Sequence, residues 1–515
     1  MIPLSPFAGA TMPTTTTTNV DAVPAHSPHT VRALTAMYDK PIGPQPENNP
    51  LVLALPAIKS DRDWIWQLTT LPDYDKEQLQ DPPHVRAYHV VALKDFFVVG
   101  ERALKLARQI DLMIRSGYVK RNPLGGDHFR ELQRAYSVAQ AAKAGKAQKI
   151  VYSVNSAIFT SSLIGVSGMG KSTTMEAILA SYPQYLIHES LGLHQVVWLK
   201  VDCPKDGSVK ELALNILRAF DAVLGTSHTP RTTKNVTVDD LMARVMQLAR
   251  AHCLGLLVVD ELQNVSVRKS GGREELLNWF QELINELKLP VFILGTFKAR
   301  EVWQLDVRHT RRVGVMGSAT WRPLARGPEF DLLIEQLWSY QWLREPGELT
   351  EEFRAVVYEE TQGIVAFIVD MFLVCQLHAL GQGKETLNAM MFRDVARKDF
   401  EFLQPLLCAL RSGQPLRMQK FPDLGSYDVD ELIQHRYMLI PQESVSTTPE
   451  SPSLSMVGRA AAKIQSALGL SGGDAKALVE SVLTADHKSH RKLTEDALAE
   501  YFKRRGDGGS DASFA

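Results

Sequence analysis

The chain has 515 residues, 45% of them hydrophobic and 22% charged, and its formal net charge at pH 7 is −1. The composition is that of an ordinary globular protein, and the length predicts two to four domains with at least one well-filled core. A near-zero net charge excludes a strong overall field toward nucleic acid or membrane, although opposite charges on different faces can hide a local basic patch.

Residues 1–50 contain the threonine run Thr14–Thr18 and many prolines. Such a segment cannot bury enough apolar surface to offset the entropy of ordering, so we expect a flexible leader. It lacks a positively charged start followed by an apolar run, so it is not a secretory signal. Four scattered cysteines without C-x-x-C spacing indicate reduced core thiols. Together these features predict a cytoplasmic protein.

Residues 51–150 are expected to form a mainly helical N-terminal extension. One helix is predicted in "VVGERALKLARQIDLMIRSG", and Gly117 is expected to end it. The spacing of its apolar stripe fits a helix with one buried face. This stripe consists of Ala103, Leu106, Ile110 and Met113.

In residues 151–329 the pattern changes, because short apolar runs now alternate with amphipathic helices. The runs are "AIFTSSLIG", "QVVWLKVD", "GLLVVDE" and "PVFILGT". Near-continuous apolar strands that alternate with helices predict a parallel sheet covered on both faces. The segment is therefore expected to be an α/β nucleotide-binding core.

The first of these strands leads into "GVSGMGKST", which matches the pattern G-x-x-x-x-G-K-[ST]. In such a loop the backbone amides point at phosphate oxygens, Lys171 meets the β- and γ-phosphates, and the Ser172 hydroxyl binds Mg²⁺. A helix starts directly afterwards, and its N-terminus adds the positive end of its dipole. The sequence therefore predicts ATP and Mg²⁺ as cofactors. The predicted phosphate-binding residues are Gly165, Val166, Ser167, Gly168, Met169, Gly170, Lys171, Ser172 and Thr173.

The run "LLVVDE" places Asp260 and Glu261 at the carboxyl end of a buried strand, where ligands bind in open α/β sheets. Asp260 is predicted to complete the coordination shell of the metal, and Glu261 to orient or deprotonate the attacking water. A neighbouring strand ends at Thr296. Its hydroxyl is predicted to contact that water or the γ-phosphate, and a simple strand-end threonine is the alternative.

Closely spaced arginines follow in "KAREVWQLDVRHTRRVGV". In ATPases that form rings or filaments, an arginine at this point reaches the γ-phosphate of the neighbouring subunit and stabilises transition-state charge. The candidates are Arg308, Arg311 and Arg312, and the alternative is a solvated basic helix end. The first interpretation predicts that isolated monomers hydrolyse ATP poorly.

Residues 330–424 have helical patterns and are expected to form a lid. Within them, "GIVAFIVDMFLVCQL" is interrupted by Asp370 and is expected to be too short to span a bilayer, so we interpret it as a buried helix. Residues 425–515 are expected to form a polar linker and a helical tail of mixed charge. The tail segment from His490 is either a partner-binding segment or a solvated terminal helix.

These motifs together resemble the TnsC family of AAA+ ATPases, the regulators of targeted DNA transposition, with TniB and MuB as more distant members. The resemblance covers residues 45–420, and its main blocks are "GVSGMGKSTT", "WLKVDCPKDGSVKELALNILRAFD", "LGLLVVDELQNVS" and "GTFKAREVWQLDVRHTRRVG". It implies an α/β fold: an AAA+ ATPase core with a parallel sheet, followed by a helical lid, with a helical N-terminal extension and a helical C-terminal tail.

The same resemblance implies an ATPase that acts as a switch and does not itself cleave DNA. It would form a homo-oligomeric ring or helical filament on double-stranded DNA, without membrane contact. A target-selection protein would recruit it, and it would activate transposase subunits for insertion. The resemblance also implies sequence-independent contacts with the DNA backbone. The candidates are Lys205, Lys210, Arg231, Thr233 and Lys234, for each of which an ordinary solvated loop charge is the alternative.

Two other functional classes stay open. A helicase loader or origin-binding ATPase uses the same core, but it predicts a DNA-reading domain after the lid, and none is recognisable in residues 425–515. A signalling NTPase predicts a sensory repeat array, which the lack of internal repeats disfavours. The lid motif "TQGIVAF" has no arginine at the position where many AAA+ proteins place a second sensor, so none is assigned.

Overall fold

The structure is a computed structural model that describes most of the chain. The chain divides into two compact units, Met1–Pro441 and Gln442–Ala515. In the second unit the longest described helix is α19 (Gly472–Val482). The described residues are 33–38, 48–119, 121–125, 160–204, 208–230, 236–264, 279–280, 283, 287–299, 318–412, 429–441, 472–483, 496–497 and 500.

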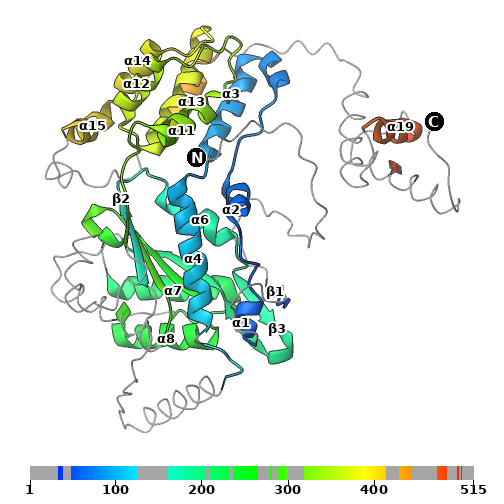
Figure 1. The fold of residues 1–515 in the computed structure, drawn as a ribbon, viewed down its shortest axis with the longest axis vertical. Coiled ribbons are helices and arrows are strands. Elements are labelled where there is room, and N and C mark those ends of the chain that lie inside the picture. Colours follow the sequence, from blue (N-terminus) through cyan, green and yellow to red (C-terminus); the bar gives the residue numbers. More distant parts are fainter. Residues whose placement is uncertain are drawn as a thin grey trace. The chain divides into compact units, whose positions relative to one another are not determined.

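A five-stranded sheet forms the centre of the first unit, and neighbouring strands in it are parallel (Figure 1). Every residue of its strands β6 and β7 is buried, as expected for parallel strands covered on both faces. The sheet confirms the predicted α/β fold. In spatial order its strands are β5 (Trp198–Asp202), β6 (Leu256–Asp260), β7 (Val291–Gly295), β2 (Thr160–Gly165) and β8 (Ser318–Trp321).

Alternate residues of the central strands belong to two separate hydrophobic cores. Val258 and Phe292 pack in the core that contains α4 and α6, whereas Val259 and Ile293 pack in the core that contains α7 and α8. Helices therefore cover both faces and leave the carboxyl edge of the sheet to the loops. These helices are α4 (Glu101–Val119), α6 (Lys171–Ala180), α7 (Val209–Leu224) and α8 (Val238–Ala251).

Two predicted boundaries were wrong. Helix α4 continues to Val119, so Gly117 does not end it. A Cβ at Gly117 would lie 2.6 Å from Cγ of Pro290, so this glycine allows α4 to approach the residue before β7. The run "QVVWLKVD" is divided between β4 and β5, because the Val197 amide between them donates to the carbonyl of Gln184, 2.9 Å away.

A second, three-stranded sheet has the order β1-β3-β4. Strand β1 pairs in parallel with β3, and the buried Asn49 and Pro50 begin α1, so several residues of the predicted leader are part of the fold. Residues 1–32 and 39–47 of that leader lie outside the described residues. The elements of this sheet are β1 (Leu34–Thr35), β3 (Tyr185–His188), the turn η3 (Glu189–Leu191) and β4 (Leu193–Val196).

The N-terminal extension connects the core to the lid. At its end, the hydroxyl of Tyr118 on α4 donates to the carbonyl of Cys253 in the core, 2.9 Å away. Earlier in the chain, α3 packs on α13 of the lid, and Arg86 of α3 forms a bidentate pair with Glu385, with distances of 2.6 and 2.7 Å. The elements that precede α4 are α1 (Pro50–Leu53), α2 (Asp61–Leu68), η1 (Lys76–Gln80), α3 (Pro83–Val91) and η2 (Ala92–Asp95).

The lid is a bundle of helices around α13, as predicted (Figure 1). By length and composition α13 is long and apolar enough to cross a membrane, so the expectation that it is too short was wrong. Within the described chain it is the one helix that passes this test, and 67% of it is buried, as in the core helix of a folded unit. The lid elements are α11 (Pro328–Trp338), α12 (Glu351–Thr361), α13 (Val365–Gln382), α14 (Ala389–Lys398), η5 (Glu401–Leu403) and α15 (Gln404–Arg411).

Two smaller predictions also differ from the structure. Helix α17 (Val429–Met438) falls in the predicted linker and tail, yet it belongs to the first unit and packs on α13 and α3. The four cysteines are thiols, but Cys408 is exposed, so it is not a core residue. The other three are buried: Cys203, Cys253 and Cys375.

Candidate functional site

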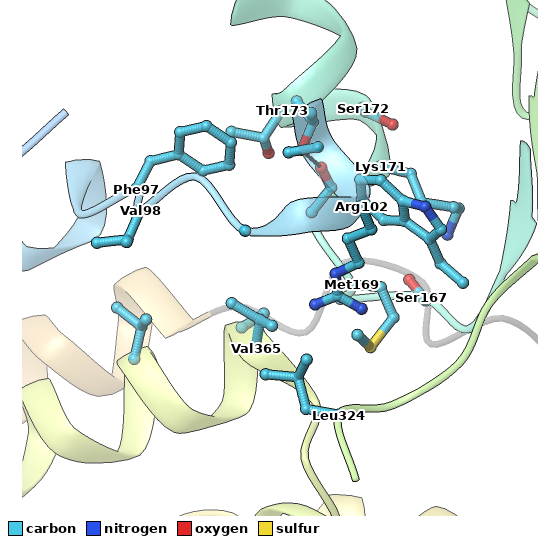
Figure 2. A pocket seen from close by; sticks show the side chains of 18 of the residues that line it. Phe97, Val98, Arg102, Ser167, Met169, Lys171, Ser172, Thr173, Leu324 and Val365 are labelled. Carbon is cyan, nitrogen blue, oxygen red and sulfur yellow. Dashed lines mark hydrogen bonds between the residues drawn. The ribbon is translucent and has the colours of Figure 1, made fainter. Parts of the chain in front are cut away.

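A cavity of about 820 Å³ lies at the carboxyl ends of the central strands. Three parts of the first unit line it: the segment 94–103 that leads into α4, the phosphate loop with the ends of β6 and β7, and the lid side from Leu324 to α13. Figure 2 shows side chains from the segment, from the phosphate loop and from the lid side around this cavity. A cavity of this size is typical of a small-molecule or cofactor site. A ligand in it would therefore contact the extension, the core and the lid together.

The predicted phosphate loop connects β2 to α6 at one wall of this cavity. Gly168 and Gly170 have φ angles of +79° and +74°, a left-handed conformation that residues with a Cβ rarely adopt. Lys171 is buried, and its Nζ donates to the carbonyls of Gly165 (3.1 Å) and Val166 (2.8 Å). The loop residues that line the cavity are Ser167, Gly168, Met169, Gly170, Lys171, Ser172 and Thr173.

The loop is also connected to the lid. The amide of Ala366, in the first turn of α13, donates to the carbonyl of Gly168 at 3.0 Å. Val365 and Ala366 line the cavity as well. The phosphate loop and the N-terminus of α13 therefore form one continuous wall.

Ser172 and Asp260 lie together at the start of α6 and the end of β6. The Ser172 hydroxyl donates to Oδ2 of Asp260 at 2.7 Å, and Asp260 is 3% exposed. Hydroxyl and carboxylate oxygens are the hard donors that Mg²⁺ prefers, and Mg²⁺ is usually held by one or two protein oxygens plus phosphates. The residues present therefore fit the metal that the sequence predicts.

Lys200 of β5 is an additional charge at this position that the sequence analysis missed. Its Nζ lies 3.4 Å from Oδ2 of Asp260, 2.9 Å from Oε1 of Glu176 and 3.3 Å from Oδ1 of Asp202. Burial opposes the charge of Lys200, but these three carboxylates outweigh it, so its pKa is raised above the ordinary value. Lys200 thus balances the negative charge around Asp260.

Glu261 and Thr296 follow β6 and β7 and both line the cavity. Glu261 has a φ of 56°, which is uncommon for a residue other than glycine and costs of order 1–2 kcal/mol. Its amide donates to Oδ1 of Asp260 at 2.8 Å. The register of β6 and β7 brings the ends of the two strands to one edge. Glu261 and Thr296 therefore lie beside each other.

The segment 94–103 lines the cavity although the sequence analysis assigned it no role. The Arg102 guanidinium lies 5.0 Å from the ring centre of Trp321 at the end of β8, and its Nη1 donates to the carbonyl of Arg322 at 3.2 Å. Phe97 and Val98 lie beside the cavity in Figure 2. No motif marks these residues, because packing rather than sequence spacing brings them to the phosphate loop.

Most of the residues predicted for DNA binding or for the subunit interface lie outside the described residues. Lys210, in the first turn of α7, is described and half-buried, and it does not line the cavity. The predictions that fall outside are Lys205, Arg231, Thr233, Lys234, Arg308, Arg311 and Arg312.

Comparisons with known proteins find one matching domain family and several solved structures. Residues 161–302 match the AAA domain. No curated protein matches the chain. Solved structures with a similar fold include the ORC1 protein of Aeropyrum pernix in complex with DNA, at 16% identity and a TM-score of 0.34, covering 73% of this chain and 93% of that one.

Two further solved structures are similar. A Walker-type ATPase of Pyrococcus abyssi has 14% identity and a TM-score of 0.33, covering 60% of this chain and 88% of that one. Drosophila ORC bound to DNA has 12% identity and a TM-score of 0.32, covering 70% and 84%.

Proposed function

We propose that this chain, a Walker-type ATPase built on an AAA domain, is a nucleotide-controlled switch that assembles on double-stranded DNA. The observation that carries the switch is the shared cavity: the extension, the core and the lid each supply part of its wall. Whether ATP, ADP or neither is present would change contacts with all three parts.

Hydrolysis is assigned to the residues at the carboxyl edge of the sheet. Lys171 would contact the β- and γ-phosphates, and Thr296 the γ-phosphate or the attacking water. Glu261 would accept a proton from that water as its oxygen attacks the γ-phosphorus and the bond to the ADP oxygen breaks. Mg²⁺, held by Ser172 and Asp260, would neutralise charge on the phosphates.

More specifically, we propose that the chain regulates targeted DNA transposition, and the resemblance to the TnsC family supports this proposal. In this proposal a homo-oligomer contacts the DNA backbone, a target-selection protein recruits it, and it activates transposase subunits. One of Arg308, Arg311 and Arg312 would act at the γ-phosphate of the neighbouring subunit. The backbone contacts would come from Lys205, Lys210, Arg231, Thr233 and Lys234.

The alternative is a helicase loader or an origin-binding ATPase. Two of the similar structures are ORC proteins bound to DNA. The two proposals differ in what DNA the protein binds: the transposition switch binds any duplex, whereas an origin-binding protein prefers particular sequences.

We expect a non-hydrolysable ATP analogue to strengthen binding to a fluorescent duplex at least about fivefold relative to ADP, a typical coupling between two sites. Affinity should fall steeply with salt and differ little between unrelated sequences, because the proposed contacts are with phosphates. Fluorescence anisotropy measures each of these.

Lys171→Ala is the matched control, since its DNA affinity should not respond to nucleotide. Strong preference for one duplex sequence would favour the origin-binding alternative. Equal affinity with the analogue, with ADP and without nucleotide would contradict the switch.

A further inference from the structure

Gln263 connects the two residues assigned to the attacking water. It lies in the turn η4 (Leu262–Asn264), directly after Glu261. Its side-chain Nε2 donates to Oε2 of Glu261, and its Oε1 accepts from the backbone amide of Thr296 at 3.0 Å. One amide group therefore bridges the end of β6 to the end of β7, and Gln263 itself lines the cavity.

The orientation of this amide is determined by its partners. The backbone N–H of Thr296 can only donate, so the oxygen of the Gln263 amide must face it. The NH₂ group is then directed at the Glu261 carboxylate, which can only accept when it is ionised. Reversing the amide would place donor against donor and acceptor against acceptor, so the bridge has a single consistent arrangement.

The turn that carries Gln263 is firmly held. Leu262 is fully buried, the Asn264 amide donates to the carbonyl of Glu261 at 2.9 Å, and Asn264 Nδ2 donates to the carbonyl of Cys203 at 3.2 Å. At Gly295 an added Cβ would lie 2.9 Å from Oε1 of Gln263, so the glycine leaves room for the bridge. These contacts fix the base of the Gln263 side chain.

The side chain of Glu261, in contrast, extends into solvent. Because Glu261 is exposed, its carboxylate can adopt several rotamers. Its backbone is in the left-handed region. A general base must lie within hydrogen-bond reach of the water that it deprotonates. Without a fixed partner, the carboxylate would occupy the productive orientation for only part of the time.

We propose that Gln263 is a positioning residue for ATP hydrolysis, holding the Glu261 carboxylate toward Thr296. Any shift of Thr296 toward the γ-phosphate is then transmitted to the base through one side chain. The inference rests on the proposed role of Glu261 as base, and it is independent of the proposed DNA and protein partners.

Two substitutions separate positioning from simple bracing of the loop. Gln263→Met keeps the length of the side chain and removes both hydrogen bonds. Gln263→Glu keeps an acceptor for Thr296, but it replaces the donor with a carboxylate that repels Glu261. If Gln263 only braced the loop at Thr296, Gln263→Glu would behave as the wild type; if it positions Glu261, Gln263→Glu should be the more damaging of the two.

Steady-state hydrolysis by the full chain should show kcat reduced about tenfold for Gln263→Met, equivalent to about 1.4 kcal/mol, and further reduced for Gln263→Glu. KM for ATP should stay within about twofold, because no proposed phosphate contact is changed. Gln67→Met, the same substitution at an exposed position of α2 outside the cavity lining, is the matched control and should leave both constants unchanged.

Combining Gln263→Met with Glu261→Gln distinguishes a failure of the positioning role from a failure of the assignment of Glu261 as the base. In that background Gln263→Met should cost little more, because the two residues act as a unit. An unchanged kcat in Gln263→Met, wild-type behaviour of Gln263→Glu, or a full additional loss in the double variant would each overturn the positioning role. If Glu261→Gln alone left turnover unchanged, the assignment of the base would be the proposal that failed.

Discussion

Glu261→Gln should lower ATP turnover at least about 100-fold while the protein still binds ATP, since general-base catalysis contributes roughly that much or more. Glutamine keeps the size of the side chain but cannot accept the proton of the attacking water. Ser172, Asp260 and Lys171 are unchanged, so the contacts proposed for the phosphates and the metal are retained. The variant should therefore accumulate in the ATP-bound state.

The measurement is single-turnover hydrolysis beside equilibrium binding of a fluorescent ATP analogue. Lys171→Ala is the contrast, because it should lose nucleotide binding itself and not only turnover. If Glu261→Gln hydrolysed ATP at the wild-type rate, the role assigned to Glu261 would be wrong, and the strained backbone at this position would need another explanation.

Arg86→Met should destabilise the first unit by about 2–3 kcal/mol, because it removes a fully buried donor from two carbonyls and from the partly buried Glu385 carboxylate. Arg86 is fully buried, and besides Glu385 it donates to the carbonyls of Asp81 and Trp342, each at 2.8 Å. The Glu385 carboxylate would retain the Arg344 amide at 2.9 Å, but it would lose its bidentate partner. Chemical denaturation followed by tryptophan fluorescence measures the loss.

A second variant shows whether the charge is the cause. Arg86→Met combined with Glu385→Leu removes both charges, so it should recover part of the stability. Burial raises the pKa of Glu385, but Arg86 and the Arg344 amide outweigh burial and lower it overall. The contribution of the pair is therefore complete above the ordinary pKa of a glutamate and is lost as the pH falls through the lowered value. A double variant as unstable as Arg86→Met would contradict this account.

The parts of the site that lie close together in the sequence could be predicted from it. A strand, a glycine loop with Lys171 and a helix follow one another within a few residues, and Asp260 and Glu261 end a buried apolar run. Each pattern is local, so the residue types and their spacing suffice. The parallel sheet followed from the alternation of such runs with helices.

The parts that depend on long-range packing could not be predicted. Lys200 reaches Asp260 because β5 pairs with β6, although two helices separate these strands in the sequence. Gln263 meets the amide of Thr296 through the pairing of β6 with β7. The strand β1 has two residues and therefore no periodic signal. Segment 94–103 enters the cavity because α3 is attached to the lid and α4 to the core.

The most direct test of a nucleotide-controlled assembly on DNA is electron microscopy of the full-length protein with duplex DNA. One sample would contain a non-hydrolysable ATP analogue and the other no nucleotide. The account predicts rings or filaments around the DNA in the first sample only, with the arginine segment 308–312 at the interface between subunits. Monomers in both samples would contradict it and would favour a signalling or metabolic NTPase.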